Sequence, residues 1–267
     1  MGDLRNFALS RRRMLALAAA AAGCGIVRGL YADQRPWPDE RSFGPYICHA
    51  DFNLDQVAAE LEQVVLLQRD VSRTLGVPGP TQPIHLFLFS GVGPYQRYLA
   101  TYLPEVPRRR AVFVKAGGPG MVFAYLSSEF EVDLRHETTH AILHAALPYL
   151  PLWLDEGIAE YFEVAAANRG TQHPHLRTLR WTVRFGGLAK IEDLEAIEEI
   201  GDMGQAEYRN SFAYVHFALH GEAEAHAELI RYLDDVGSGR DAGKFSERLR
   251  ARVANLDVAV TEHLRNW

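Results

Sequence analysis

The chain has 267 residues, 48% of them apolar, and a formal net charge of −6. This length allows one large domain or two small ones with a sizeable core, and the acidic balance argues against a nucleic-acid partner. Two cysteines permit at most one disulfide bond, so the fold does not depend on a disulfide framework.

The N-terminal 23 residues have the pattern of an export signal. Arg11–Arg13 precede an apolar run, Ala16–Ala22, that is too short to span a bilayer. Both a twin-arginine and a general secretory signal fit this pattern. Ala21–Cys24 resembles a bacterial lipobox, in which Cys24 would be acylated. We therefore expect an exported, periplasmic or cell-surface protein, with a lipid anchor at Cys24 as its one route to a membrane and lipidation itself left open.

Residues 24–45 are expected to form a tether, because Asp33–Pro45 is polar and rich in proline. The domain then occupies residues 46–267, with an α/β half at 46–127 and a helical half at 128–267. One basic cluster lies outside the N-terminal region, at Arg108–Arg110, and we interpret it as a solvated loop.

Hydrophobic periodicity predicts a mixed first half and a helical second half. The first half is expected to contain a helix from Leu54 to about Leu75, a strand at Ile84–Phe89, a short helix near Tyr95–Tyr102, and strands at Ala111–Lys115 and Met121–Leu126. The second half is expected to contain helices at about 133–147, 152–167, 175–186, 192–199, 207–220, 223–235 and 243–254. The fold class is therefore α+β, with a small α/β subdomain and a short mixed sheet packed on a mainly helical subdomain.

The most informative motif is His-Glu-Thr-Thr-His at residues 136–140. On a helix, His136 and His140 lie one turn apart on one face, so both imidazoles can bind one metal ion. Glu137 can approach a water molecule on that metal. Glu156, on the next predicted helix, offers a third ligand and leaves a fourth position open. The motif predicts one Zn²⁺ per chain and a metallohydrolase.

Nearby residues offer other ligand assignments. His144 follows His136 by eight residues, about 12 Å of helix rise, which is too far for one ion to contact both. It is expected to pack or to hydrogen-bond to a ligand. Asp155 points away from the face that Glu156 and Glu160 share, so Glu156 is kept as the ligand. Glu160 either accepts a hydrogen bond from a ligand histidine or is a solvated carboxylate.

The histidine motif, together with Trp-Leu-Asp-Glu-Gly-Ile-Ala-Glu-Tyr-Phe at 153–162, resembles the gluzincin metallopeptidases. These peptidase-MA-like enzymes include thermolysin and a branch of zinc aminopeptidases. More narrowly, the chain is similar to a largely planctomycete group of exported proteins. The likeness runs from about Phe52 to His220 and is most specific between Leu134 and Phe162. It implies a thermolysin-like zinc site at the junction of the two halves.

The resemblance implies a role for each residue of the motif. His136, His140 and Glu156 would bind zinc, and Glu137 would be the general base. The interval between the second histidine and Glu156 is shorter than in the two well-known branches. The chain also lacks a Gly-Ala-Met-Glu-Asn type of motif, so recognition of a peptide amino terminus is not predicted.

Gluzincins often stabilise the reaction oxyanion with a downstream Tyr or His. Here the candidates are Tyr208 and Tyr214, and the family-like Tyr-x-x-Ser at 208–211 favours Tyr208 over the alternative of a packed aromatic residue. His216 and His220 lie in an apolar helix, where packing is the expected role. By the same resemblance, an extended peptide would bind along the edge strand nearest the zinc helix, expected at Met121–Leu126.

The sequence therefore predicts a zinc-dependent metallopeptidase that cuts a peptide or protein substrate with a zinc-bound water activated by Glu137. Two alternatives stay open: a catalytically silent zinc-binding scaffold or adhesion module, and a hydrolase of a non-peptide bond. A retained Glu137 argues against the silent alternative, since a structural zinc needs no base and usually has four protein ligands. The sequence predicts no oligomeric state.

Overall fold

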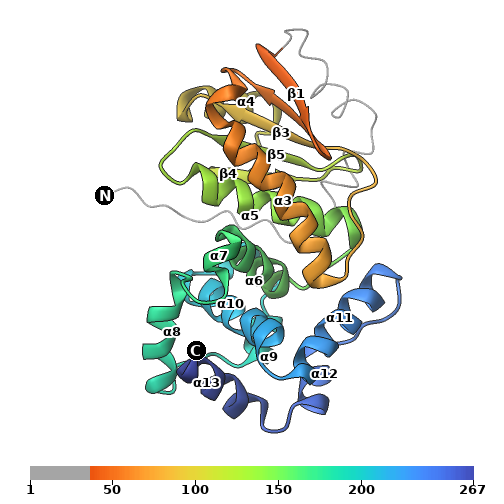
Figure 1. The fold of residues 1–267 in the computed structure, drawn as a ribbon, viewed down its shortest axis with the longest axis vertical. Helices are drawn as coiled ribbons and strands as arrows, with labels where there is room; N and C mark the ends of the chain where they lie inside the picture. The colour runs from red at the N-terminus through yellow and green to blue at the C-terminus, as the bar shows by residue number, and fades with distance from the viewer. Residues whose placement is uncertain (1–36) are drawn as a thin grey trace. The chain divides into compact units, whose positions relative to one another are not determined.

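The computed structural model describes residues 37–267, which form two compact units (Figure 1). The sheet unit contains residues 37–74 and 78–146, and the helical unit contains residues 75–77 and 147–267. The predicted mixed α and β fold with a small mixed sheet is confirmed. The predicted export signal and the lipobox at Cys24 lie outside the described residues.

The division between the units falls after Ala146, whereas the sequence predicted a change after residue 127. The helix that carries both motif histidines therefore belongs to the same unit as the sheet. The helices of the sheet unit are α3 (Ala58–Leu75, preceded by the 3-10 turn η1 at Leu54–Val57), α4 (Val92–Tyr102) and α5 (Phe130–Ala146).

Five strands form one mixed sheet in the order β1-β2-β3-β5-β4. They are β1 (Asp39–Phe43), β2 (Tyr46–Ala50), β3 (Ile84–Phe89), β4 (Ala111–Val114) and β5 (Met121–Tyr125). The pairs β2–β3 and β3–β5 are parallel, while β1–β2 and β4–β5 are antiparallel.

The expectation that Met121–Leu126 forms the edge strand is wrong. Strand β5 lies between β3 and β4, and the two edge strands of the sheet are β1 and β4. The side chains of β5 are almost all buried, as expected for a strand that is covered on both faces, whereas those of β4 are mostly half-buried. Both segments are short apolar runs, so composition alone could not separate them.

The tether prediction also needs correction, because residues 39–43 form β1. This strand pairs with β2 through a two-residue turn, in which Gly44 has a φ of +54°. Asp39 and Arg41 are bonded to each other on this edge strand. Charged residues are common on sheet edges, where they discourage pairing with other chains. The polar composition that suggested a tether is therefore that of an edge strand.

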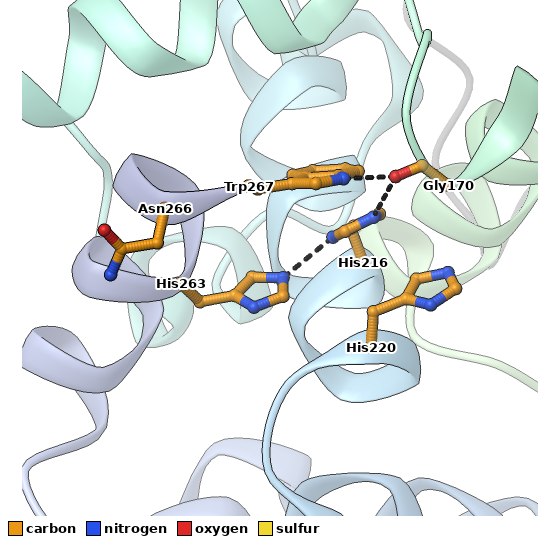
Figure 2. A pocket seen from close by; sticks show the side chains of 6 residues that line it. All are labelled: Gly170, His216, His220, His263, Asn266 and Trp267. Carbon is orange, nitrogen blue, oxygen red and sulfur yellow. Dashed lines mark hydrogen bonds between the residues drawn. The ribbon is translucent and has the colours of Figure 1, made fainter.

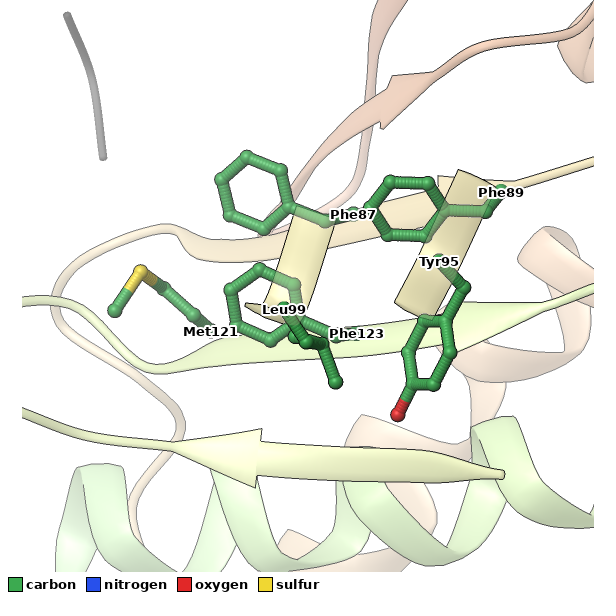
Figure 3. Packing of buried hydrophobic residues seen from close by; sticks show 6 residues of the cluster. All are labelled: Phe87, Phe89, Tyr95, Leu99, Met121 and Phe123. Carbon is green, nitrogen blue, oxygen red and sulfur yellow. The ribbon is translucent and has the colours of Figure 1, made fainter. Parts of the chain in front are cut away.

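An aromatic cluster covers one face of the sheet (Figure 3). Its members come from two neighbouring strands and from α4, and comprise Phe87, Phe89, Tyr95, Leu99, Met121 and Phe123. Alternate residues of a strand share a face, as do helix residues four apart, so each element places its two residues together. Helix α5 packs on β4 and β5 from the other face. Val112 and Val114 of β4 pack against the aromatic cluster, so Phe113 between them points to the opposite face, where its ring stacks on His140 of α5.

The helical unit is built around the contact between α6 and α10. Its helices are α6 (Leu152–Glu163), α7 (Ala166–Arg169), α8 (His175–Arg184), α9 (Ile191–Glu195), α10 (Gln205–His220), α11 (Ala223–Gly237), α12 (Phe245–Arg252) and α13 (Leu256–Asn266), with a 3-10 turn, η2, at Ile200–Asp202. Helix α13 was not predicted, and the predicted helix 152–167 is divided into α6 and α7. Within residues 37–267, no helix has both the length and the apolar character needed to cross a bilayer.

Candidate metal centre

The two motif histidines meet on one face of α5. Nε2 of His136 lies 3.2 Å from Nε2 of His140, and the planes of the two rings differ by 70°. Two imidazole nitrogens bound tetrahedrally to one Zn²⁺ would lie about 3.3 Å apart, given a Zn–N distance of about 2.0–2.1 Å. The same separation also suits a hydrogen bond between the rings. The pair therefore has the spacing that a shared ion requires.

Glu137 is held at the open edge of the sheet. Its Oε2 accepts a hydrogen bond from the backbone N–H of Phe113 in β4, with an N···O distance of 2.7 Å. Because this N–H is directed to Glu137, it faces away from the neighbouring strand β5. The candidate general base thus lies between the two motif histidines in sequence, and its carboxylate is bonded to β4, a strand at one edge of the sheet.

Residues around the motif fix the end of α5 against β4. The ring of Phe113 stacks on His144 at 5.6 Å between centroids, and the Lys115 ammonium donates to the carbonyl of His144. His144 therefore packs on the strand, one of the two roles expected for it. Arg110, from the predicted solvated loop, is paired with Asp133 on α5 at 2.9 Å. Burial nevertheless raises the pKa of Asp133 above its usual value.

In the helical unit, Glu156 occupies a crowded position on α6. Its side chain is only 6% exposed. The next residue, Gly157, touches α10 so closely that an added Cβ would lie 2.7 Å from the carbonyl oxygen of Ser211. Only glycine allows the two helices to approach to this distance. The Glu-Gly pair in the sequence is therefore explained in part by helix packing, which sequence reasoning did not foresee.

Glu160 has a partner that the sequence did not indicate. Its carboxylate Oε2 lies 2.7 Å from Nε2 of His175, and its backbone carbonyl accepts a hydrogen bond from His173. Burial lowers the pKa of His173 to about 4, so this ring is neutral near neutral pH. The carboxylate of Glu160 therefore has an imidazole partner from its own unit.

The two candidate tyrosines are in different surroundings. The Tyr214 hydroxyl donates to the carbonyl of Ala189 at 2.9 Å, and burial raises its pKa. Tyr208 is half-buried in the first turns of α10, three residues before Ser211, which contacts Gly157. Helix geometry thus places Tyr208 near the crossing of α10 with the helix that carries Glu156.

His216 and His220 belong to a histidine cluster within the helical unit (Figure 2). His216 is hydrogen-bonded to the carbonyl of Gly170 at 3.3 Å and to His263 at 2.9 Å, while His220 bonds to the hydroxyl of Tyr161 at 2.7 Å. They line a cavity of about 310 Å³. Burial lowers the pKa of all three histidines, which keeps them neutral. No sequence signal connected His263 on α13 with this cluster.

Histidine and carboxylate side chains in the described part of the chain include groups that could hold a metal ion. No family model matches the chain, and no curated protein matches it. The assignment of a function therefore rests on the motif residues and on their geometry within each unit.

Proposed function

We propose that this protein is an exported zinc-dependent metallopeptidase, with one Zn²⁺ held by His136, His140 and Glu156. The observation that carries the proposal is the arrangement on α5. Two imidazole nitrogens lie 3.2 Å apart, and the carboxylate of Glu137, the residue after His136, accepts a hydrogen bond from edge strand β4. Two histidines, one carboxylate and an adjacent glutamate are the residue types that hydrolytic zinc sites use.

The choice of Glu156 as third ligand is supported by its surroundings in the helical unit. It is a buried carboxylate on the helix that follows α5, and a buried negative charge is well matched to a divalent cation. A zinc ion would supply that cation. Glu160, one turn further along α6, has its carboxylate bonded to His175.

When bound, zinc would polarise the scissile carbonyl and lower the pKa of a coordinated water molecule. Glu137 takes the proton from the attacking water and delivers it to the leaving amine. The Phe113 N–H restricts the carboxylate of Glu137 to one position, which favours a defined path for the proton. Tyr208 donates a hydrogen bond to the oxyanion that forms as the water attacks.

We infer that the substrate is an extended peptide paired with the outer side of β4. This strand is one of the two edges of the sheet and contains Phe113, whose N–H is bonded to Glu137. An edge strand offers a row of backbone donors and acceptors that an added strand can use. Pairing there would place the backbone of the peptide next to the proposed base.

The test compares the wild type with Glu137→Gln on a broad peptide library, with cleavage followed by mass spectrometry and zinc measured by atomic spectroscopy. Glutamine keeps the size of the side chain and can still accept from Phe113, but it cannot take a proton. Both proteins should hold about one zinc per chain, and the variant should cleave about 10²- to 10⁴-fold more slowly. Glu129→Gln, the same change at an exposed position of the same unit, should behave as the wild type.

Each other outcome has a definite meaning. A zinc-loaded wild type that cuts no peptide would favour the silent scaffold. If it instead hydrolyses an ester or amide probe and the Glu137→Gln variant does not, the substrate is not a peptide. Equal cleavage by both proteins would remove Glu137 from the role of base.

A further inference from the structure

Helix α8 of the helical unit presents an unusual outer face. Its inner side is buried through Leu176, Leu179 and Val183. Its outer side carries Trp181, which is 58% exposed, and Phe185, which directly follows the last residue of the helix, is 77% exposed. Large aromatic side chains this exposed are uncommon on a soluble surface and often mark an interaction site.

The charge around α8 is opposite to that of the whole chain. Residues 164–191 contain five basic residues and no Asp or Glu, although the chain has a formal net charge of −6. Three of the five, Arg177, Arg180 and Arg184, are exposed residues of α8. Successive residues of a helix are separated by 100° around its axis, so these arginines and the two aromatic residues fall within roughly 140° around the axis of α8. We call these five residues the α8 face.

The side chains of the α8 face are organised rather than scattered. The rings of Trp181 and Phe185 stack with 6.0 Å between centroids and only 8° between planes. The Arg184 guanidinium lies 6.0 Å from the Trp181 ring. Arg180 donates to the backbone carbonyl of Trp267. Within residues 37–267, no carboxylate forms an ion pair with Arg177 or Arg184, which leaves their charge available to an anionic partner.

A cavity of about 280 Å³ lies beside the C-terminal end of α8. Lys190, Arg265 and the hydroxyl-bearing Thr261 are among the residues that line it. The carboxylate of Asp257 also lines it, but Asp257 is paired with Arg250 at 3.0 Å. The cavity therefore adds two cationic side chains, those of Lys190 and Arg265, next to the α8 face. Its volume suits a phosphate-bearing headgroup.

We propose that the α8 face binds the surface of a membrane that contains anionic lipids. Exposed Trp and Phe side chains enter the interface between headgroups and acyl chains, while arginines bind headgroup phosphates. A partner made only of acidic peptide would match the arginines but would leave the stacked aromatic pair in water. The combination of both features favours a lipid surface. This inference does not depend on the proposed peptidase activity.

The experiment measures tryptophan fluorescence of the full chain with vesicles whose lipids carry bromine on the acyl chains, because bromine quenches only residues that enter the bilayer. Phosphatidylcholine vesicles with roughly 30% phosphatidylglycerol, which gives the vesicle surface a negative potential, are compared with vesicles of phosphatidylcholine alone. Quenching is expected with the anionic vesicles and should largely disappear in Trp181→Phe. The N-terminal region is identical in both proteins, so its own membrane binding does not alter the comparison.

The double variant Arg177→Gln/Arg184→Gln tests the charge. Each arginine near an anionic surface should raise the affinity about fivefold, so the loss of both should lower the affinity on the order of tenfold or more. Arg73→Gln/Arg108→Gln, which removes two exposed arginines from the sheet unit, should leave binding unchanged. Quenching that persists in Trp181→Phe would overturn the proposal. So would binding to polyglutamate with no quenching by anionic vesicles, since that result would indicate an acidic-peptide site.

Discussion

The two units supply their parts of the proposed site in different ways. In the sheet unit, His136, Glu137 and His140 lie within five consecutive residues of one helix, and one backbone hydrogen bond from β4 holds the glutamate. In the helical unit, the position of Glu156 depends on a close crossing of α6 and α10 at Gly157. The first arrangement is local and follows from helix periodicity. The second requires helices that are distant in sequence to pack correctly.

The largest effect should come from breaking that crossing. In Gly157→Ala, the new Cβ would lie 2.7 Å from the carbonyl oxygen of Ser211 and 2.9 Å from a side-chain carbon of Val215. Backbone atoms cannot rotate away, so the helices must separate, at a cost of about 3 kcal/mol. Urea denaturation should show this loss. Gly118→Ala in the sheet unit, where an added Cβ meets nothing within 4 Å, should leave stability unchanged; equal effects would show that the crossing is not tight.

The two tyrosines of α10 should separate catalysis from stability. Tyr208→Phe should lower kcat about a hundredfold with little change in KM, since it removes a donor to the oxyanion. Tyr214→Phe should leave kcat unchanged but lower the free energy of unfolding by about 1 kcal/mol, because it loses the hydrogen bond to Ala189. If Tyr214→Phe lowers kcat and Tyr208→Phe does not, the assignment is reversed.

A smaller effect should appear in the pH dependence of stability. Because burial lowers the pKa of His173 from 6.5 to about 4, the unfolded chain gains a proton there before the native state does. The stability that neutral His173 contributes to the native state is therefore complete above pH 6.5 and is lost as the pH falls towards 4. As the pH falls from 6.5 to 5.5, protonation of His173 in the unfolded chain should lower the free energy of unfolding by about 1 kcal/mol.

Unfolding measured across this pH range for the wild type and for His173→Gln tests the assignment. The variant should show a shallower loss of stability. The exposed His226→Gln serves as the control and should keep the slope of the wild type. An unchanged slope in His173→Gln would mean that other groups, such as His216 and His263, carry the pH dependence.

Local patterns in the sequence were enough to predict much of both units. The strand at Ile84–Phe89 and the helices that carry the motif lie close to their expected bounds, because each has a clear period or a proline at its boundary. Strand β1 was missed because charged edge strands and polar linkers have similar compositions. The position of β4 at the edge depends on strand order, which local patterns do not specify.

For the candidate site, the sequence indicated the residue types but not their neighbours. The spacing of His136 and His140 follows directly from the helix repeat. Three contacts of the site join segments that are separated in sequence. They are the hydrogen bond from Phe113 to Glu137, the bond between Glu160 and His175, and the close approach of Gly157 to α10. Such tertiary contacts leave no periodic signal that a single sequence could reveal.

The most direct test of the central claim is the zinc affinity of Glu156→Ala, measured by competition with a chelator of known affinity. Loss of a ligand should weaken binding more than about a hundredfold, whereas Glu160→Ala, which removes a carboxylate bonded to His175, should change affinity less than about tenfold. An unchanged affinity in Glu156→Ala, or a larger loss in Glu160→Ala, would contradict the proposed set of ligands.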